Sequence, residues 1–203
     1  MEFRRGCTEA EAGWMKPTFI TSNPHKFAEV RRILGRLGID VRRENIRYTE
    51  RRGEDVAEIA ADSARWLRGR VRPPFFVEDT GLFIDALGGF PGAYSAWVLQ
   101  KIGRAGVLRL LRGARDRRAA FRSAVALWDG RRVRVFEGEV RGTIALSERG
   151  SGGFGYDPIF IPRGEKRTFA EMRAEEKDAL SSRGRALAAL VEFLSRSVRC
   201  RIK

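Results

Sequence analysis

Cysteine and histidine are scarce in this sequence. Of its 203 residues, two are cysteines, Cys7 and Cys200 near opposite ends, and one is a histidine, His25. Two cysteines so far apart and outside any metal-ligand spacing favour neither a disulfide framework nor a zinc site. A single histidine without a recognisable partner motif leaves little room for a Ser/His/Asp or Cys/His nucleophile. If the chain is an enzyme, carboxylates and a hard cation such as Mg²⁺ are its expected tools.

Long apolar runs are absent as well. The sequence has no stretch of about 18 apolar residues that could span a bilayer, and the N-terminal segment MEFRRGCTEAEAGWMKP has no apolar core of the kind that an export signal needs. With 43% apolar residues, the chain can form one good core or two small lobes that share a cleft. We therefore expect a cytoplasmic protein with no membrane partner, built as one globular unit.

Acidic residues are outnumbered by basic ones. The sequence has 26 Asp and Glu against 40 Lys and Arg, which gives a formal net charge of +14. Such a charge suits a polyanionic partner, such as nucleic acid, a membrane surface or a phosphorylated small molecule. The basic residues are scattered along the chain, often as Arg-Arg pairs, and form no single tract. A solvated basic surface is therefore favoured over nucleic-acid binding as the meaning of the charge.

Strand and helix patterns alternate along the chain without an internal repeat or a linker. The unbroken apolar run in PPFFV is typical of a strand covered on both faces, and Asp129-Gly130 is a strong hairpin signal between two strand-like segments. The pattern predicts strands at 18–21, at 73–77 and on both sides of that turn, and helices at 24–37, 54–68, 103–112 and 182–194. We therefore expect an α/β protein with a mixed sheet.

The segment FFVEDTG, residues 75–81, runs from a buried strand into two adjacent carboxylates and a glycine turn. Ligands of open α/β sheets bind beyond the carboxyl ends of the strands, where we expect Glu78, Asp79 and Thr80 to lie. Successive side chains of a strand point to opposite faces, so the two acids should not both face one ligand unless the chain has turned. We select Asp79 as the functional acid. The alternative is that the pair only caps the GLFIDAL segment that follows.

The segment TSNPHK indicates a phosphate site. A short strand leads into a helix start capped by Asn23, with Pro24 at the first helical position. Free backbone N–H groups and the positive end of the helix dipole then face the loop, and Lys26 adds a point charge. The alternative is a plain capped helix with a surface lysine.

The segment SGGFGYDP indicates a base-stacking loop. Its glycines allow a close backbone approach, Phe154 and Tyr156 offer aromatic faces, and Asp157 offers an acceptor. Stacking of a base on such a ring contributes roughly 1–3 kcal/mol. The alternative is a glycine-rich connection with core aromatics. A phosphate loop, an acid suited to a hard metal and a stacking loop in one chain together favour a nucleotide site.

These motifs resemble those of the inosine triphosphate pyrophosphatase family. TSNPHK, FFVEDTGLFIDALGGFPGAYS, GGFGYDPIF, TFAEM and Lys177 followed by SSRGRAL occur in the order and spacing of that family, and the resemblance covers residues 18–195. It implies a long mixed, twisted sheet flanked by helices, with two lobes around a central substrate cleft, and a homodimer. It also implies Mg²⁺-dependent hydrolysis of non-canonical purine nucleoside triphosphates, such as ITP, dITP and XTP, to a monophosphate and pyrophosphate.

The resemblance also implies a role for particular residues of this sequence. Asp79 would be the catalytic acid and a Mg²⁺ ligand, with Glu50 as the other acidic ligand. The polyphosphate would be held by Thr21, Ser22, Asn23 and Lys26, with Thr80 beside Asp79 at the substrate. The base would be bound by Phe154, Gly155, Tyr156, Asp157, Lys177, Ser182 and Arg183.

The sequence departs from the family pattern at three places. Ser22 replaces the glycine of the family's T-G-N motif, Ser182 replaces the histidine of its S-H-R triplet, and residues 1–16 precede its usual start. We expect residues 1–16 to be a disordered extension or to lie before the true start, and residues 17–203 to form a single domain. In the family the His-Arg pair reads the 6-keto oxygen of the purine. Here we expect Arg183 to keep the larger share of that recognition, with Ser182 as a weaker hydroxyl donor.

The sequence leaves two other functions open. One is a related pyrophosphatase for pyrimidine or modified nucleotides, for which the missing histidine leaves room. The other is a basic nucleic-acid-binding protein without catalysis, which would bind DNA or RNA with a steep salt dependence and release no pyrophosphate.

Overall fold

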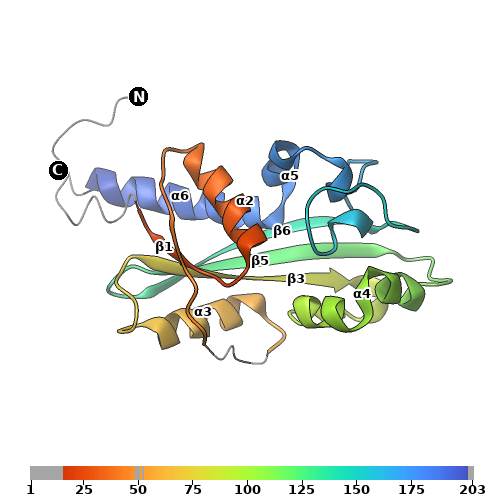
Figure 1. Ribbon diagram of the computed structural model, residues 1–203, viewed down its shortest axis with the longest axis horizontal. Coiled ribbons are helices and arrows are strands. Elements are labelled where there is room, and N and C mark those ends of the chain that lie inside the picture. The colour runs from red at the N-terminus through yellow and green to blue at the C-terminus, as the bar shows by residue number, and fades with distance from the viewer. Residues whose placement is uncertain (1–15, 49–50, 52, 201–203) are drawn as a thin grey trace.

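A long mixed β-sheet is the centre of the computed structural model, which describes residues 16–48, 51 and 53–200 (Figure 1). In this part of the chain the sheet has seven strands in the order β2-β1-β3-β5-β6-β7, with β4 paired to β3 outside that path. β1 is parallel to β2 and β3, and the other pairs are antiparallel. The expected α/β fold with a mixed sheet is confirmed. The strands are β1 (Thr18–Ile20), β2 (Arg42–Glu44), β3 (Phe75–Ile84), β4 (Pro91–Gly92), β5 (Arg118–Trp128), β6 (Val133–Ile144) and β7 (Phe160–Pro162).

Helices cover both faces of the sheet. In Figure 1, α2 and α6 lie on one face, and α3 and α4 lie on the other. None of the helices in the described residues is long and apolar enough to cross a membrane. The helices are α2 (Pro24–Gly35), α3 (Val56–Leu67), α4 (Ser95–Leu110), α5 (Ala174–Leu180) and α6 (Ser182–Cys200), with short 3-10 turns η1 (Asp85–Leu87), η2 (Asp157–Ile159) and η3 (Phe169–Glu171).

Side-chain caps fix where the first two helices begin. Asn23 accepts hydrogen bonds from the backbone N–H groups of the second and third residues of α2, as its sequence position predicts. Asp55 caps α3 in the same way and therefore lies just before that helix, not inside its first turn as expected. α2 ends at Gly35, earlier than the sequence pattern indicates, and Leu37 is exposed beyond that end.

β3 is longer than the sequence indicates. It runs from Phe75 to Ile84, so Glu78 and Asp79 lie in its middle and not at its end. Gly81 makes no turn; it stays in the strand, where an added Cβ would lie 2.6 Å from the carbonyl oxygen of Gly92 in β4. The expectation of a glycine turn was wrong because a glycine in a strand can also mark the close approach of another backbone segment.

The remaining elements were predicted in part. The β5–β6 hairpin around Asp129-Gly130 and the helix after Ser181 are confirmed. α4 is interrupted at Gly103, where φ is +65°, and its second half matches the short helix expected at 103–112, whereas the first half, from Ser95, was not predicted. Short β2, β4 and β7, together with α5, carry too little periodicity to be found from sequence.

The buried core falls into clusters on either side of the pocket described below. At one end, α2 and α6 pack on one face of the sheet and α3 packs on the other. At the other end, α4, β7 and the far parts of β3, β5 and β6 form a separate cluster. This division produces the two lobes that the resemblance implies. The boundary expected between residues 1–16 and 17–203 stays a prediction, since residues 1–15 lie outside the described part.

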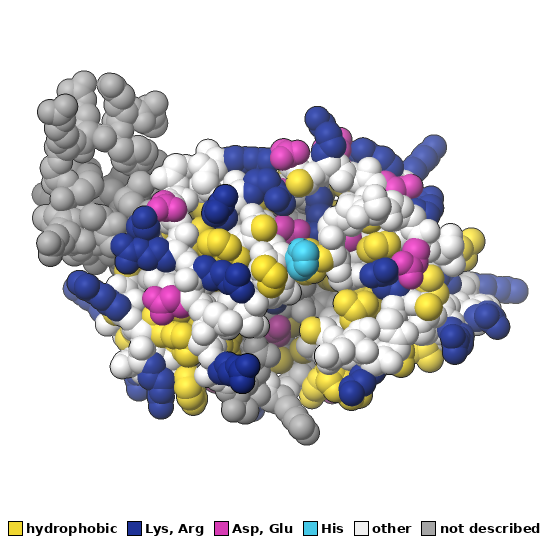
Figure 2. Space-filling model, in the orientation of Figure 1, with side chains coloured by type: hydrophobic (Ala, Val, Ile, Leu, Met, Phe, Trp, Pro, Cys, Tyr) yellow, Lys and Arg dark blue, Asp and Glu magenta, His cyan; other side chains and the backbone are white. Residues whose placement is uncertain are grey.

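The basic side chains are spread over the surface. Figure 2 shows Lys and Arg distributed over the visible face and interrupted by acidic and apolar groups. Many arginines of the described chain pair with neighbouring acids, as Arg118 does with Asp116 and Arg65 with Asp62. The visible face therefore gives no single basic tract for a nucleic-acid backbone to follow.

Candidate active site

One pocket between the two lobes brings the predicted site residues together. Its volume is about 590 Å³. Every site residue predicted within the described part of the chain lines it, whereas Glu50 lies outside the described residues. The predicted residues on its wall are Thr21, Ser22, Asn23, Lys26, Asp79, Thr80, Phe154, Gly155, Tyr156, Asp157, Lys177, Ser182 and Arg183.

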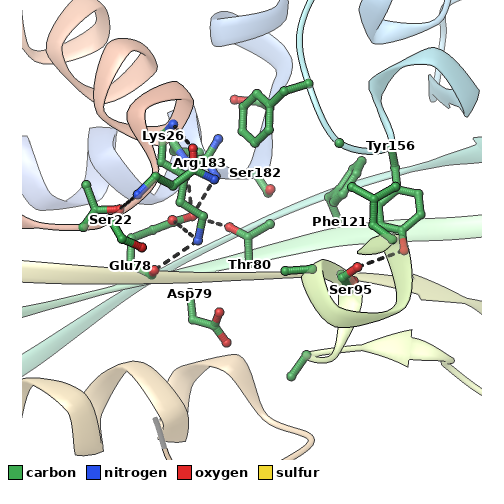
Figure 3. Close-up of a pocket in the computed structure, with 18 of the residues that line it drawn as sticks. Ser22, Lys26, Glu78, Asp79, Thr80, Ser95, Phe121, Tyr156, Ser182 and Arg183 are labelled. Carbon is green, nitrogen blue, oxygen red and sulfur yellow. Dashed lines mark hydrogen bonds and ion pairs between the residues drawn. The ribbon is translucent and has the colours of Figure 1, made fainter. Parts of the chain in front are cut away.

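The open edge of β3 explains how two adjacent acids line one pocket. β1 pairs with β3 only as far as Phe76, and β4 pairs with it only from Leu82 onward. Among the described strands, none pairs with this edge between those residues. Figure 3 shows Asp79 on the opposite side of β3 from Glu78 and Thr80, as strand alternation requires. The pocket passes over the open edge and thus reaches side chains on both faces of the strand.

The phosphate loop, residues 21–26, is held in a defined shape. The Asn23 side chain accepts from the N–H groups of His25 and Lys26 at 2.9 and 3.2 Å, and the Asn23 N–H donates to Thr21 Oγ1 at 3.1 Å. From β2, Arg43 donates to the carbonyl oxygens of Thr21 at 3.1 Å and Ser22 at 2.7 Å. These contacts orient the peptide groups at the start of α2, where the helix dipole favours an anion.

Glu78 is an ion-paired anchor beneath this loop. Its carboxylate lies 2.8 Å from Lys26 Nζ and 3.1 Å from Arg183 Nη2. Burial alone would raise the pKa of Glu78, but the attraction of Arg183 and then Lys26 exceeds that effect and lowers the pKa to about 2. Lys26 also donates to the Glu78 carbonyl oxygen on the open edge of β3 at 3.2 Å. The charge of Lys26 is therefore partly compensated, and its position is fixed by Glu78.

A second set of buried charges lies behind the base loop, residues 151–157. Lys177 Nζ contacts Glu29 at 2.6 Å and also pairs with Asp157, while Arg183 pairs with the other oxygen of Glu29. Burial raises the pKa of Glu29, but Arg183 and Lys177 together lower it below its ordinary value. For Asp157 burial prevails over the attraction of Lys177, and its pKa is raised. Lys177 and Arg183 are thus anchored in the wall of the pocket.

The aromatic side chains of the base loop differ in exposure. Tyr156 is buried in the core, and its hydroxyl donates to the Ser95 carbonyl oxygen at 2.9 Å. Phe154 is half-buried, and the ring of His25 stacks on it with centroids 5.3 Å apart and planes 16° apart. Lys177 Nζ lies 4.7 Å from the centroid of the Phe154 ring. Phe154 is the more exposed of the two rings, and Tyr156 holds the loop in place.

A row of hydroxyl groups crosses the floor of the pocket. Thr80 in β3 lies 2.7 Å from Ser123 in β5, and Ser123 lies 2.8 Å from Ser182 at the start of α6. Thr80 also donates to Glu78. Because α6 approaches β6 closely at Gly138, where an added Cβ would lie 2.1 Å from the Ser182 carbonyl oxygen, this arrangement is fixed by backbone packing.

Four residues that shape the site were not predicted from the sequence: Glu29, Arg43, Ser123 and, as a stacking partner, His25. Two of them, Ser123 and Glu29, could have been found from the sequence. Ser123 stands on the same strand face as the buried Val125 and Leu127, and Glu29 directly precedes the buried Val30. A polar residue at a core position needs a partner inside the protein. No local pattern marked Arg43 or the His25 stack, because both depend on contacts between distant segments.

Sequence comparison places the chain among proteins of closely similar length. Residues 18–193 match the model of the Ham1 family. A dITP/XTP pyrophosphatase of Thermococcus kodakarensis is 48% identical over 185 residues, which cover 91% of this chain and 100% of the relative. A dITP/XTP pyrophosphatase of Korarchaeum cryptofilum is 52% identical over 178 residues, which cover 88% and 95%.

Solved structures share the fold over almost the same extent. A Ham1 protein from Coxiella burnetii superimposes with a TM-score of 0.76 and 31% identity, covering 89% of this chain and 98% of the other. A structure from Mycobacterium abscessus, described as nucleoside-triphosphatase / dITP/XTP pyrophosphatase, gives a TM-score of 0.68 and 38% identity, covering 86% and 97%. The resemblance seen in the motifs is confirmed, and the chain belongs to the Ham1 family.

Proposed function

We propose that this protein hydrolyses non-canonical purine nucleoside triphosphates, with dITP, XTP and ITP as substrates, to the monophosphate and pyrophosphate, and so removes them from the nucleotide pool. The observation that carries the proposal is that one pocket holds the phosphate loop, the half-buried Phe154 ring and the open edge of β3 with Asp79. The names of the Thermococcus and Korarchaeum relatives support the same activity.

The donor chemistry at the open edge fits Mg²⁺. In the described part of the chain no three Cys, His, Asp or Glu side chains gather as a metal cluster. Mg²⁺ commonly keeps several waters and takes one or two carboxylates together with substrate phosphates, which Asp79 and, outside the described residues, Glu50 would supply. When bound, Mg²⁺ would neutralise phosphate charge and activate water. Its requirement is part of the proposal.

The chain's own residues have distinct tasks in the proposed reaction. Lys26 and the side chains of Thr21 and Ser22, at the positive end of the α2 dipole, bind the polyphosphate and stabilise the negative charge that develops as pyrophosphate leaves. Asp79 orients or deprotonates the water that attacks between the α and β phosphates. Phe154 stacks on the base, while Lys177 and Arg183 stay fixed behind it by their buried acids.

A product assay tests this proposal. We expect purified protein with Mg²⁺ to release pyrophosphate and monophosphate from dITP, XTP and ITP, and to act poorly on ATP. Orthophosphate as the first product would contradict the reaction. Preference for pyrimidine triphosphates would favour the related pyrophosphatase, while salt-sensitive binding of DNA or RNA without turnover would favour the nucleic-acid alternative. The homodimer and the cytoplasmic location stay predictions; sedimentation equilibrium tests the first.

Arg43 offers a test of loop positioning. Replacing Arg43 with methionine removes two hydrogen bonds to the phosphate-loop carbonyls. We expect kcat/KM for ITP to fall about 3–10-fold, mostly through KM, because a loss of about 1 kcal/mol changes an equilibrium roughly five-fold. Steady-state kinetics and a thermal melt measure both effects, and the melting temperature should change little because the side chain is exposed.

Two further variants separate position from charge. Arg43→Lys keeps the positive charge but lacks the fork that reaches both carbonyls, so it should recover only part of the lost kcat/KM. Arg42→Met removes the neighbouring exposed arginine of β2 and should behave as wild type. Equal losses in Arg42→Met and Arg43→Met would show that only the general surface charge matters.

A further inference from the structure

The row of hydroxyl groups on the pocket floor has a direction. Each hydroxyl carries one proton, so it can donate only one hydrogen bond. Glu78 Oε1 lies 3.2 Å from Arg183 Nε and 3.1 Å from Arg183 Nη2, both of which are donors. That oxygen is therefore an acceptor, and the proton of its close contact with Thr80 comes from Thr80.

The direction then passes along the row. Because Thr80 donates its proton to Glu78, the 2.7 Å contact with Ser123 needs the proton of Ser123. Ser123 has no second proton, so the 2.8 Å contact with Ser182 needs the proton of Ser182. The hydroxyl proton of Ser182 is therefore turned toward the wall, and only its lone pairs are left for a ligand in the pocket.

We propose that Ser182 is a hydrogen-bond acceptor in the base-binding part of the pocket, that Ser123 sets this polarity, and that the pair selects purines carrying an N1–H group. This inference rests on the proposed function. Hypoxanthine, xanthine and guanine carry a donor at N1, whereas adenine presents a lone pair there. An acceptor at Ser182 attracts the first group and repels adenine. The expectation that Ser182 donates to the 6-keto oxygen is thereby reversed.

The surrounding structure holds the row in this arrangement. Ser123 and Ser182 are both buried. Ser123 pairs across the sheet with Gly138, the residue on which the first turn of α6 rests. The Ser181 hydroxyl accepts from the Gly184 N–H at 3.0 Å and fixes the start of that helix. The backbone of Ser182 is therefore fixed beside β6, which keeps its hydroxyl within reach of Ser123.

An isosteric pair of substrates tests the polarity. 1-Deaza-ATP replaces the N1 of ATP with C–H and so removes the lone pair without adding bulk. We expect wild-type kcat/KM for 1-deaza-ATP to exceed that for ATP about 3–10-fold. In Ser123→Ala the proton of Ser182 is free to turn into the pocket, so ATP should gain and the ratio should fall to one or below. In Ser182→Ala neither polarity remains, and the ratio should be about one.

A matched serine variant provides the control for this test. Ser63→Ala removes another buried serine, on α3 and outside the pocket, and should keep the wild-type ratio. A wild type that hydrolyses 1-deaza-ATP no better than ATP overturns the assigned polarity, and this result needs no variant. A folded Ser123→Ala variant that keeps the wild-type ratio overturns it as well. Failure to release pyrophosphate from ITP, dITP and XTP would instead overturn the proposed function.

Discussion

Replacing Asp79 with asparagine should reduce turnover of ITP by about 10²–10⁴-fold while the fold persists, the range typical of losing a positioned acid or base. The asparagine would keep the shape of the side chain but lose the charge that holds a hard cation or accepts a proton from water. The Asp79 side chain lies at the open edge of β3, where the pocket reaches the face of the sheet that carries α3. Pyrophosphate release at saturating Mg²⁺ measures the loss, and circular dichroism checks the fold.

A matched control and a binding measurement sharpen this test. Asp85→Asn changes an exposed acid just after the same strand, outside the pocket, and should leave turnover unchanged. Calorimetric titration of Mg²⁺ in the presence of a non-hydrolysable triphosphate should show weaker binding in Asp79→Asn. Near wild-type turnover of Asp79→Asn would remove this residue from the reaction, and unchanged Mg²⁺ binding with lost turnover would leave it only the role of positioning water.

Replacing Arg183 with methionine should lower the free energy of unfolding by about 3–5 kcal/mol, the usual loss when one partner of a buried ion pair is removed. Arg183 is 5% exposed and bridges Glu29 and Glu78. The variant would leave these two acids with one lysine each and an excess buried negative charge. A thermal melt should show a fall on the order of 10 °C for a chain of this size.

Two comparisons distinguish lost pairing from general damage to α6. Arg185→Met, two residues along the same helix, removes an exposed side chain with one bond to the Glu139 carbonyl oxygen and should change stability by less than about 1 kcal/mol. Adding Glu78→Gln to Arg183→Met restores the balance of charge and should recover part of the loss. A double variant no more stable than Arg183→Met would show that packing, and not charge, accounts for the effect.

The same pairing predicts a dependence on pH. The pKa of Glu78 is lowered from 4.5 to about 2 in the folded chain, so its stabilising contribution is complete above pH 4.5 and is lost as the pH falls toward 2. The contribution is on the order of 3 kcal/mol. Arg183→Met removes a main cause of the lowered pKa. We would measure the free energy of unfolding by denaturant between about pH 5 and pH 2, where Glu78 titrates. It should fall less steeply with decreasing pH in Arg183→Met than in wild type.

Local sequence determined much of the framework. The Asn23 cap with Pro24, the Asp129-Gly130 turn and the apolar run of β3 each depend on residues within a few positions of one another, and all three appear where the sequence predicts them. Their physical causes are short-range: a side chain that accepts backbone N–H groups, a glycine at positive φ, and apolar residues that need cover on both faces. The gathering of the predicted site residues followed because the motifs flank these elements.

The sequence could not locate the ends of elements that depend on other segments. β3 continues past Asp79 because β5 pairs with it as far as Ile84, and the start of α4 depends on how Ser95 bonds to Gly92 and Leu82. Alternation along a strand correctly separated Glu78 from Asp79. It could not show that the neighbouring strands leave an edge open between Phe76 and Leu82, through which one pocket reaches both faces.

Sequence alone thus predicted which residues line the pocket: residues 21–26, Asp79 and the loop at 151–157, each readable from local composition and spacing. The tertiary structure decided how the pocket residues are ion-paired and in which direction their hydrogen bonds run. Lys177 and Arg183 are fixed by Glu29, 148 and 154 positions away, and the polarity of Ser182 is set by Ser123 and Thr80 on two strands. A hydrogen bond or an ion pair depends on distance in space, and only the packed sheet and helices bring these groups within reach of one another.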